Sequence, residues 1–246
     1  MEIQVAVAKV GKYATSESGD TLEMIERPHG GLSFVLADGQ RSGRAAKSIS
    51  NMVTRKAIAL LAEGIRDGAA ARAAHDYLYT HRQGKVSATL NIASVDMQTK
   101  TLVLSRNSHC PVIIQYANGN QTVLDEPTQQ IGIYRMTRPE ITEIPLQVGL
   151  VVIVFSDGVL SAGQRRRQQM DITQLASLID SLYADHCNSE QMAWPVADGL
   201  LARALELDEG RPSDDVSILV LAVSPCERDD VRRLQLQVPI PPLHRP

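Results

Sequence analysis

Long hydrophobic runs, paired cysteines and zinc-binding histidine motifs are all missing from this sequence. No apolar run approaches the roughly 20 residues that a membrane-spanning helix needs, and the first residues, MEIQVAVAKVGK, lack the layout of a signal peptide. We therefore expect a cytoplasmic protein with no membrane partner. The three cysteines have no CxxC spacing, which indicates reduced thiols, and the six histidines form no HxH or HExxH motif, which argues against a zinc site.

An excess of either charge is also missing. The chain has 25 Lys and Arg residues against 28 Asp and Glu residues, for a net charge of -3, and basic residues do not dominate any long stretch. No nucleic-acid partner is therefore expected. A metal-dependent nuclease is disfavoured for the same reason, because the charge balance offers no basic substrate groove. No internal repeat or low-complexity linker divides the 246 residues, so we expect one main domain.

The sequence does contain a clear succession of strand and helix patterns. Period-two apolar stretches predict strands, and a change to a period of about 3.6 after Gly43 predicts a helix. The Asn118-Gly119 pair predicts a tight hairpin turn. Strands or hairpins are expected in 3–8, 21–38, 85–96, 100–106, 111–124, 149–158 and 214–223, and helices in 43–64, 66–83, 171–184 and 190–206. This order predicts a layered α/β sandwich of mainly antiparallel sheets rather than a doubly wound parallel sheet.

Acidic residues stand at four of the expected strand ends. Aspartate is a poor strand residue and is costly to bury without a partner, so four such ends make sense if they converge on a cation. Oxygen ligands favour Mg²⁺ or Mn²⁺ over zinc, and a glycine after the aspartate would let the backbone approach the ion closely. Each Asp-Gly could instead be a simple turn dipeptide, because spacing alone does not prove convergence. The four acidic elements are Asp20, Asp38-Gly39, Asp157-Gly158 and Asp214-Asp215.

Seven short segments carry a resemblance to a known family: SGD, LADGQRSGRAAKSIS, SATLNIASVD, NSHCPVIIQ, QQIGI, FSDGV and SDDVSILVL. In this order, over about residues 3–224, they resemble the PPM-type metal-dependent serine/threonine phosphatases. The chain is most similar to the stage II sporulation protein E branch, which includes short single-domain members of stressosome and partner-switching systems. The resemblance implies an αββα sandwich, with two mainly antiparallel sheets flanked by helices, and a centre of two divalent cations, Mn²⁺ or Mg²⁺.

The resemblance also implies a role for each acidic element. Asp38 would bridge both metals and the Gly39 carbonyl would bind one of them, which Asp20 would hold directly or through water. Asp157 and Asp214 would hold the other metal, and Asp215 stands next to them with a less defined role. The reaction would use a water activated by the metals, so Asp38 and Asp157 would be catalytic through that water and no protein nucleophile is needed.

Departures from the family pattern leave several roles open. Gln40 and Arg41 replace its glycine-rich continuation, and Arg41 could contact a phosphate or simply lie on the surface. His109 could orient a water or a leaving group, or it could be structural. The arginine that some relatives use to hold the phosphate, upstream of the first aspartate, is absent, and Lys12 is the nearest cation that could replace it. The basic run Arg165–Arg167 could steer an acidic phosphoprotein, or it could be an ordinary solvated face.

The function implied by the resemblance is a cytoplasmic signal-transduction enzyme. It would be a protein phosphatase that removes phosphate from serine or threonine of a regulatory protein, such as a STAS-type anti-sigma-factor antagonist or a stressosome component. The alternative is a catalytically weak pseudophosphatase that binds a phosphoprotein. We expect a monomer or a weak homodimer.

The last residues of the chain are expected to form a separate extension. Residues 1–225 would form the phosphatase domain and residues 226–246 a C-terminal extension. Within it, Leu234, Leu236 and Val238 alternate with glutamines, which predicts one extra strand over 231–238 before a proline-rich end. We expect that strand to pair with the chain's own sandwich or, less favourably, with that of a dimer partner.

Overall fold

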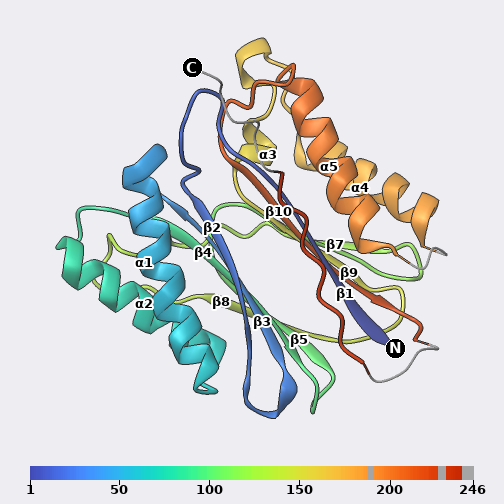
Figure 1. The fold of residues 1–246 in the computed structure, drawn as a ribbon, viewed down its shortest axis with the longest axis horizontal. Coiled ribbons are helices and arrows are strands. Elements are labelled where there is room, and N and C mark those ends of the chain that lie inside the picture. Colours follow the sequence, from blue (N-terminus) through green and yellow to red (C-terminus); the bar gives the residue numbers. More distant parts are fainter. Residues whose placement is uncertain (188–190, 227–230, 240–246) are drawn as a thin grey trace.

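Two sheets packed face to face form the centre of the fold (Figure 1). The computed structural model describes residues 1–187, 191–226 and 231–239, and within them each sheet has five strands. The first sheet has the order β1-β10-β9-β6-β7, from β1 (Glu2–Val10), β6 (Val112–Gln115), β7 (Gln121–Leu124), β9 (Val151–Phe155) and β10 (Val216–Ser224). The second has the order β2-β3-β4-β5-β8, from β2 (Asp20–Glu26), β3 (Leu32–Gly39), β4 (Ala88–Asp96), β5 (Thr101–Asn107) and β8 (Glu140–Pro145). All the strand pairs described are antiparallel.

A helical layer covers the outer face of each sheet (Figure 1). The helices α1 (Gly43–Ala62) and α2 (Asp67–Arg82) pack on the second sheet, and α4 (Ile172–His186) and α5 (Ala193–Leu207) pack on the first. Three short turns, α3 (Gly158–Ser161), η1 (Pro28–Gly30) and η2 (Gln164–Arg166), complete the helical elements described. This arrangement confirms the predicted αββα sandwich. No helix in the described part of the chain is both long enough and apolar enough to cross a membrane.

The strand β3 shows why the central strands are apolar throughout. Its Val35 and Ala37 pack under α1 and α2, whereas Phe34 and Leu36 lie between the two sheets. Both faces of the strand are therefore buried, and a period-two polar pattern is not needed. A strand held on both faces is a rigid support for the residue at its end, which is Asp38.

One strand was not predicted. The strand β8 lies at the edge of its sheet, where it pairs with β5 alone. Ile144 is its one fully buried residue, and the others are exposed or partly exposed. Edge strands of this kind carry little hydrophobic pattern, so the sequence offered no period-two signal to read.

The strand predicted for 231–238 is not formed. Residues 231–239 have no regular secondary structure, and the Leu234 and Leu236 side chains are about four-fifths exposed. The segment is held to its own sandwich by a side chain instead, because Arg232 lies 3.3 Å from Glu26 Oε1 and donates to the Gly30 carbonyl at 3.0 Å. A β-strand needs backbone hydrogen bonds to a neighbouring strand, and side-chain contacts do not supply them. The apolar alternation of this segment is therefore not enough to make it a strand. The proline-rich end, residues 240–246, lies outside the described residues.

Candidate metal centre

The β2–β3 hairpin brings two of the predicted ligands together. Its antiparallel register places Asp20 directly opposite Asp38. Directly opposed residues have Cβ atoms about 5 Å apart, and like charges in that position repel each other. Asp20 is almost fully buried and Asp38 is half-buried, so water screens this repulsion only in part. A pair of this kind requires either a proton or a cation between the carboxylates.

The adjoining ends of β9 and β10 bring the other predicted ligands to the same place. The Ser156 amide donates to the Ser217 carbonyl at 2.9 Å, and the Ser217 amide donates to Ser156 Oγ at 3.0 Å. These bonds hold Asp157 next to Asp214 at one end of the sandwich. The pKa of Asp38 is raised to about 9, first by burial and then by the carboxylates of Asp20, Asp157 and Asp214. The four predicted aspartates therefore act on one another electrostatically.

The residues present fit a hard divalent cation. Asp20 Oδ2 is buried and has no hydrogen-bond partner, which is costly unless an ion or a proton satisfies it. Burial raises the pKa of Asp20 to about 6, against the opposing effect of the Ser217 and Ser156 hydroxyls and the Lys9 ammonium. Among the described residues, no group of three or more His, Cys, Asp or Glu side chains is close enough to hold an ion as it stands. The Asp157 and Asp214 side chains are both 37% exposed, so neither is enclosed in the interior, and their binding to an ion stays a prediction.

The glycines of the two Asp-Gly motifs have a packing role in addition to the one predicted. A Cβ atom on Gly39 would overlap the carbonyl of Ala46 in α1, and a Cβ atom on Gly158 would overlap the carbonyl of Asp215. Both glycines are therefore required because another backbone segment packs against them. Close approach to an ion is not needed to explain them. Whether the Gly39 carbonyl binds an ion stays a prediction.

Asp215 holds the loop that precedes Asp20. Its Oδ1 accepts a hydrogen bond from the Lys12 amide at 2.8 Å, and its Oδ2 accepts one from the Gly19 amide at 2.7 Å. The side chain is almost fully buried. Each oxygen thus has a backbone partner between β1 and β2, and this gives Asp215 a positioning role for Asp20.

Two lysines that the sequence reading did not select also contact Asp20. Lys9 Nζ, from β1, and Lys47 Nζ, from α1, each donate to the Asp20 carbonyl at 2.7 Å. Lys47 also donates to Thr21 Oγ1 at 3.0 Å. The one signal in the sequence was Lys9 itself, a lysine at a position that shares a face of β1 with the apolar Ile3, Val5 and Val7. Two cations at one carbonyl reduce the repulsion among the nearby carboxylates.

His109 and Lys12 both reach the site. His109 Nε2 lies 3.6 Å from Asp157 Oδ2, and His109 Nδ1 lies 3.1 Å from Gln130 Nε2. The Asp157 carboxylate raises the pKa of His109. Lys12 Nζ lies 3.8 Å from Asp214 Oδ1. Both side chains therefore contact a predicted ligand, and their roles stay predictions.

Arg41 stands at the tip of the loop between β3 and α1. Its backbone is left-handed, with φ of 80°, and its side chain is exposed. The side chain makes no hydrogen bond or ion pair with any other residue in the described ranges. Gln40 is held instead by the residue just before β4, because its Oε1 accepts from the Ser87 amide at 3.2 Å. Arg41 is therefore free to meet a ligand from solvent, and its predicted phosphate contact is not tested.

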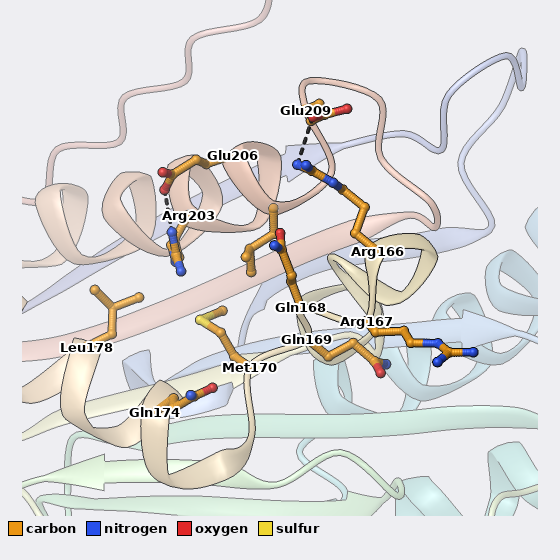
Figure 2. A pocket seen from close by; sticks show the side chains of 11 residues that line it. Arg166, Arg167, Gln168, Gln169, Met170, Gln174, Leu178, Arg203, Glu206 and Glu209 are labelled. Carbon is orange, nitrogen blue, oxygen red and sulfur yellow. Dashed lines mark hydrogen bonds and ion pairs between the residues drawn. The ribbon is translucent and has the colours of Figure 1, made fainter.

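The basic run Arg165–Arg167 lies beside a pocket of about 820 Å³ between η2, α4 and α5 (Figure 2). Figure 2 shows Arg166 paired with Glu209, at 2.7 Å, and Arg203 paired with Glu206, at 2.6 Å. Arg165 donates to the Arg211 carbonyl at 3.5 Å. Part of the positive charge of this run is therefore neutralised within the chain, which weakens the prediction that it steers a substrate.

We expect the metal-free protein to lose stability as the pH rises. In the folded chain Asp20 and Asp38 keep protons that the unfolded chain releases near pH about 4, so their contribution is fully present below that pH. It should be lost as the pH rises through about 6 for Asp20 and about 9 for Asp38. Urea unfolding at a series of pH values, in EDTA and in saturating Mg²⁺, measures this. The same decline in both conditions would contradict a cation site at these carboxylates.

The architecture is that of the PPM-type serine/threonine phosphatases, also called PP2C. The PP2C phosphatase domain of SpoIIE from Bacillus subtilis, solved with a fragment of its regulatory domain, superposes with a TM-score of 0.77 at 18% identity, over 91% of this chain and 63% of that chain. The catalytic domain of the phosphatase PstP, in complex with two manganese ions, superposes with a TM-score of 0.66 at 15% identity, over 91% of this chain and 99% of that chain. These similarities show the fold and confirm the predicted resemblance.

Residues 28–224 match the family described as Stage II sporulation protein E (SpoIIE), and the chain belongs to that family. The stage II sporulation protein E of Priestia megaterium is 22% identical over 158 residues, which is 64% of this chain. That match spans only 27% of the relative's length.

Proposed function

We propose that this chain is a Mn²⁺- or Mg²⁺-dependent phosphatase that hydrolyses phosphoserine or phosphothreonine on a protein. The observation that carries the proposal is the pairing of Asp20 with Asp38 at two strand ends, within the electrostatic reach of Asp157 and Asp214. Structural neighbours that are PPM serine/threonine phosphatases, one of them solved with two manganese ions, support the reaction class and the type of cation.

Each residue has a part in the proposed mechanism. Asp38 would hold both cations, with Asp20 on one side and Asp157 and Asp214 on the other. When bound, the cations supply a lowered pKa for the attacking water and charge stabilisation for the phosphoryl oxygens. His109, next to Asp157, is placed to hold or release a proton near the leaving oxygen.

The surrounding residues keep these ligands in place. Asp215 anchors the loop that carries Asp20, through the Lys12 and Gly19 amides, and Lys9 and Lys47 hold the Asp20 carbonyl. Arg41, which is exposed at the loop tip, is the candidate to meet the substrate phosphate. Rigid strand ends give such groups the precision that catalysis requires.

We propose that the substrate is a phosphorylated regulatory protein. The family, and a neighbour that contains RsbU and RsbW domains, support a role in regulation. A STAS-type anti-sigma-factor antagonist is the specific candidate, with a cytoplasmic location and a monomeric or weakly dimeric state. The division into a phosphatase domain, 1–225, and an extension, 226–246, belongs to the same proposal.

A pseudophosphatase is the second candidate. The observations that favour it are the open arrangement of the carboxylates, with Asp157 and Asp214 both partly exposed, and the raised pKa of Asp38, which keeps that carboxyl protonated at neutral pH without a cation. Such a protein would bind a phosphoprotein and leave its phosphate in place.

Phosphate release distinguishes the two candidates. Purified protein is incubated with phosphoserine, phosphothreonine and phosphotyrosine peptides, each in Mn²⁺ and in EDTA. We expect phosphate release from the phosphoserine and phosphothreonine peptides in Mn²⁺, and none from any peptide in EDTA. Binding of the peptides without release, in any divalent cation, would favour the pseudophosphatase.

A further inference from the structure

A basic groove runs along the exposed side of α1 and reaches Tyr77 of α2. It has a volume of about 740 Å³ and lies apart from the pocket of Figure 2. Met52 and Tyr77 are among the residues that line it. Its charged lining consists of four cations and one carboxylate, Arg44, Lys47, Arg55, Lys56 and Glu17. The net charge of -3 gave no indication of this groove, because helical spacing gathers cations that are scattered in the sequence.

The groove has the length of a short peptide segment. Arg44 and Arg55 are eleven positions apart on one helix, which corresponds to about 16 Å at 1.5 Å per residue. An extended chain covers that distance in about five residues. The groove is therefore long enough to bind a few residues of an extended peptide, but too short to bind a long polymer.

One end of the groove adjoins the candidate metal centre. Lys47 lines the groove and also donates to the Asp20 carbonyl and to Thr21 Oγ1. The helix α1 begins at Gly43, four residues after Gly39. A peptide with its phosphorylated residue at the carboxylates would thus have its neighbouring residues next to the groove.

Two of the cations that line the groove, Arg55 and Lys56, have no acidic partner among the described residues. In the described ranges Arg55 forms no hydrogen bond or ion pair, and Lys56 makes only a cation–π contact, with its Nζ 5.8 Å from the centre of the Tyr77 ring. Arg44 lies 3.8 Å from Glu17 and remains 86% exposed. In contrast, Arg166 in the run after Asp157 is already paired with Glu209. The unpaired charge available to an anionic partner is therefore greater on α1.

We propose that the basic groove binds an acidic segment of the protein substrate, next to its phosphorylated residue. This inference rests on the proposed phosphatase function and names the kind of substrate that it acts on. An acidic protein segment fits better than a nucleic acid, because the groove is short and includes the apolar side chain of Met52, while the whole chain carries a net negative charge.

The test uses two phosphoserine peptides that differ only beside the phosphoserine, one with Glu and Asp and one with Gln and Ser. The groove variant is Arg55→Ala/Lys56→Ala. A matched control, Arg66→Ala/Arg72→Ala, removes two exposed cations elsewhere on the same helical layer. We expect the groove variant to lose about tenfold in kcat/KM on the acidic peptide at low salt, mainly through KM. The neutral peptide, a small aryl phosphate and the control variant should show no change.

Two further measurements decide the remaining outcomes. Raised ionic strength should reduce the difference between the groove variant and the unmodified chain. The triple variant Arg165→Ala/Arg166→Ala/Arg167→Ala should keep the preference for the acidic peptide. Equal loss on both peptides in the groove variant, or loss of the preference in the triple variant, would overturn the assignment to α1.

Peptide binding separates this inference from the proposed reaction. Fluorescence anisotropy of a labelled acidic phosphopeptide in EDTA measures how tightly the peptide binds when no hydrolysis takes place. Weaker binding by the groove variant would support the inference even if no hydrolysis occurs. Equal binding by both proteins would overturn it, and so would a short single-stranded DNA that binds more tightly than the acidic peptide.

Discussion

Replacing Asp38 with Asn is expected to lower Mn²⁺-dependent phosphate release by about 10³-fold or more, since the bound cations supply several kcal/mol of stabilisation and each tenfold corresponds to about 1.4 kcal/mol. An amide cannot bridge two cations with two charged oxygens, so both would be weakened. The fold should remain intact. Without a cation Asp38 keeps its proton at neutral pH, because its pKa is about 9, and a neutral Asn resembles that state. The Tm in EDTA should therefore be unchanged.

A matched control separates the loss of a ligand from the loss of a charge. Asp180→Asn removes one exposed carboxylate from α4, which carries none of the four acidic elements. It should keep full phosphate release. If folded Asp38→Asn protein releases phosphate in Mn²⁺ at a rate close to that of Asp180→Asn, Asp38 is not the shared ligand.

Replacing Gly39 with Ala is expected to destabilise the protein by on the order of 3 kcal/mol. The added Cβ would overlap the backbone carbonyl of Ala46, so either α1 or the end of β3 must move. A backbone atom cannot rotate away as a flexible side chain can. The displacement should also carry Lys47 away from the Asp20 carbonyl. Urea unfolding measures the loss of stability.

Gly119→Ala provides the control for this substitution. Gly119 has a left-handed backbone, with φ of 81°, and no heavy atom lies within 4 Å of its added Cβ. The change should cost only about 1 kcal/mol, from backbone strain. Should Gly39→Ala prove as stable as Gly119→Ala, the contact between β3 and α1 does not require a glycine. The explanation of the Asp-Gly motif by backbone packing would then fail.

The sequence was informative about the strand ends and the order of the elements. The stretch 21–38, expected as strands or a hairpin, folds into the antiparallel pair β2–β3, and this pairing brings Asp20 opposite Asp38. The helices expected at 171–184 and 190–206 lie at 172–186 and 193–207. Long periodic segments carry such signals because their pattern is repeated over several turns or strand positions.

Features that depend on contacts between distant segments could not be predicted from the sequence. The requirement for Gly158 comes from the Asp215 backbone, which is 57 positions further along the chain. Lys9 and Lys47 meet at one carbonyl although they lie on different elements. The prediction of a strand over 231–238 was wrong because it rested on a local pattern alone. An apolar alternation does not ensure that a sheet edge is available for the segment to pair with. Local sequence patterns specify helices and strands, whereas contacts between distant segments determine which residues meet at the site and which strands pair.

The number of cations bound to the chain tests the central claim most directly. Isothermal titration of the metal-free protein with Mn²⁺, repeated with Asp38→Asn, measures how many ions the carboxylates hold. We predict about two Mn²⁺ per chain for the unmodified protein, as two-metal hydrolytic sites require, and a loss of that binding in Asp38→Asn. No binding to the unmodified protein, or the same binding by both proteins, would contradict a metal centre at Asp20, Asp38, Asp157 and Asp214.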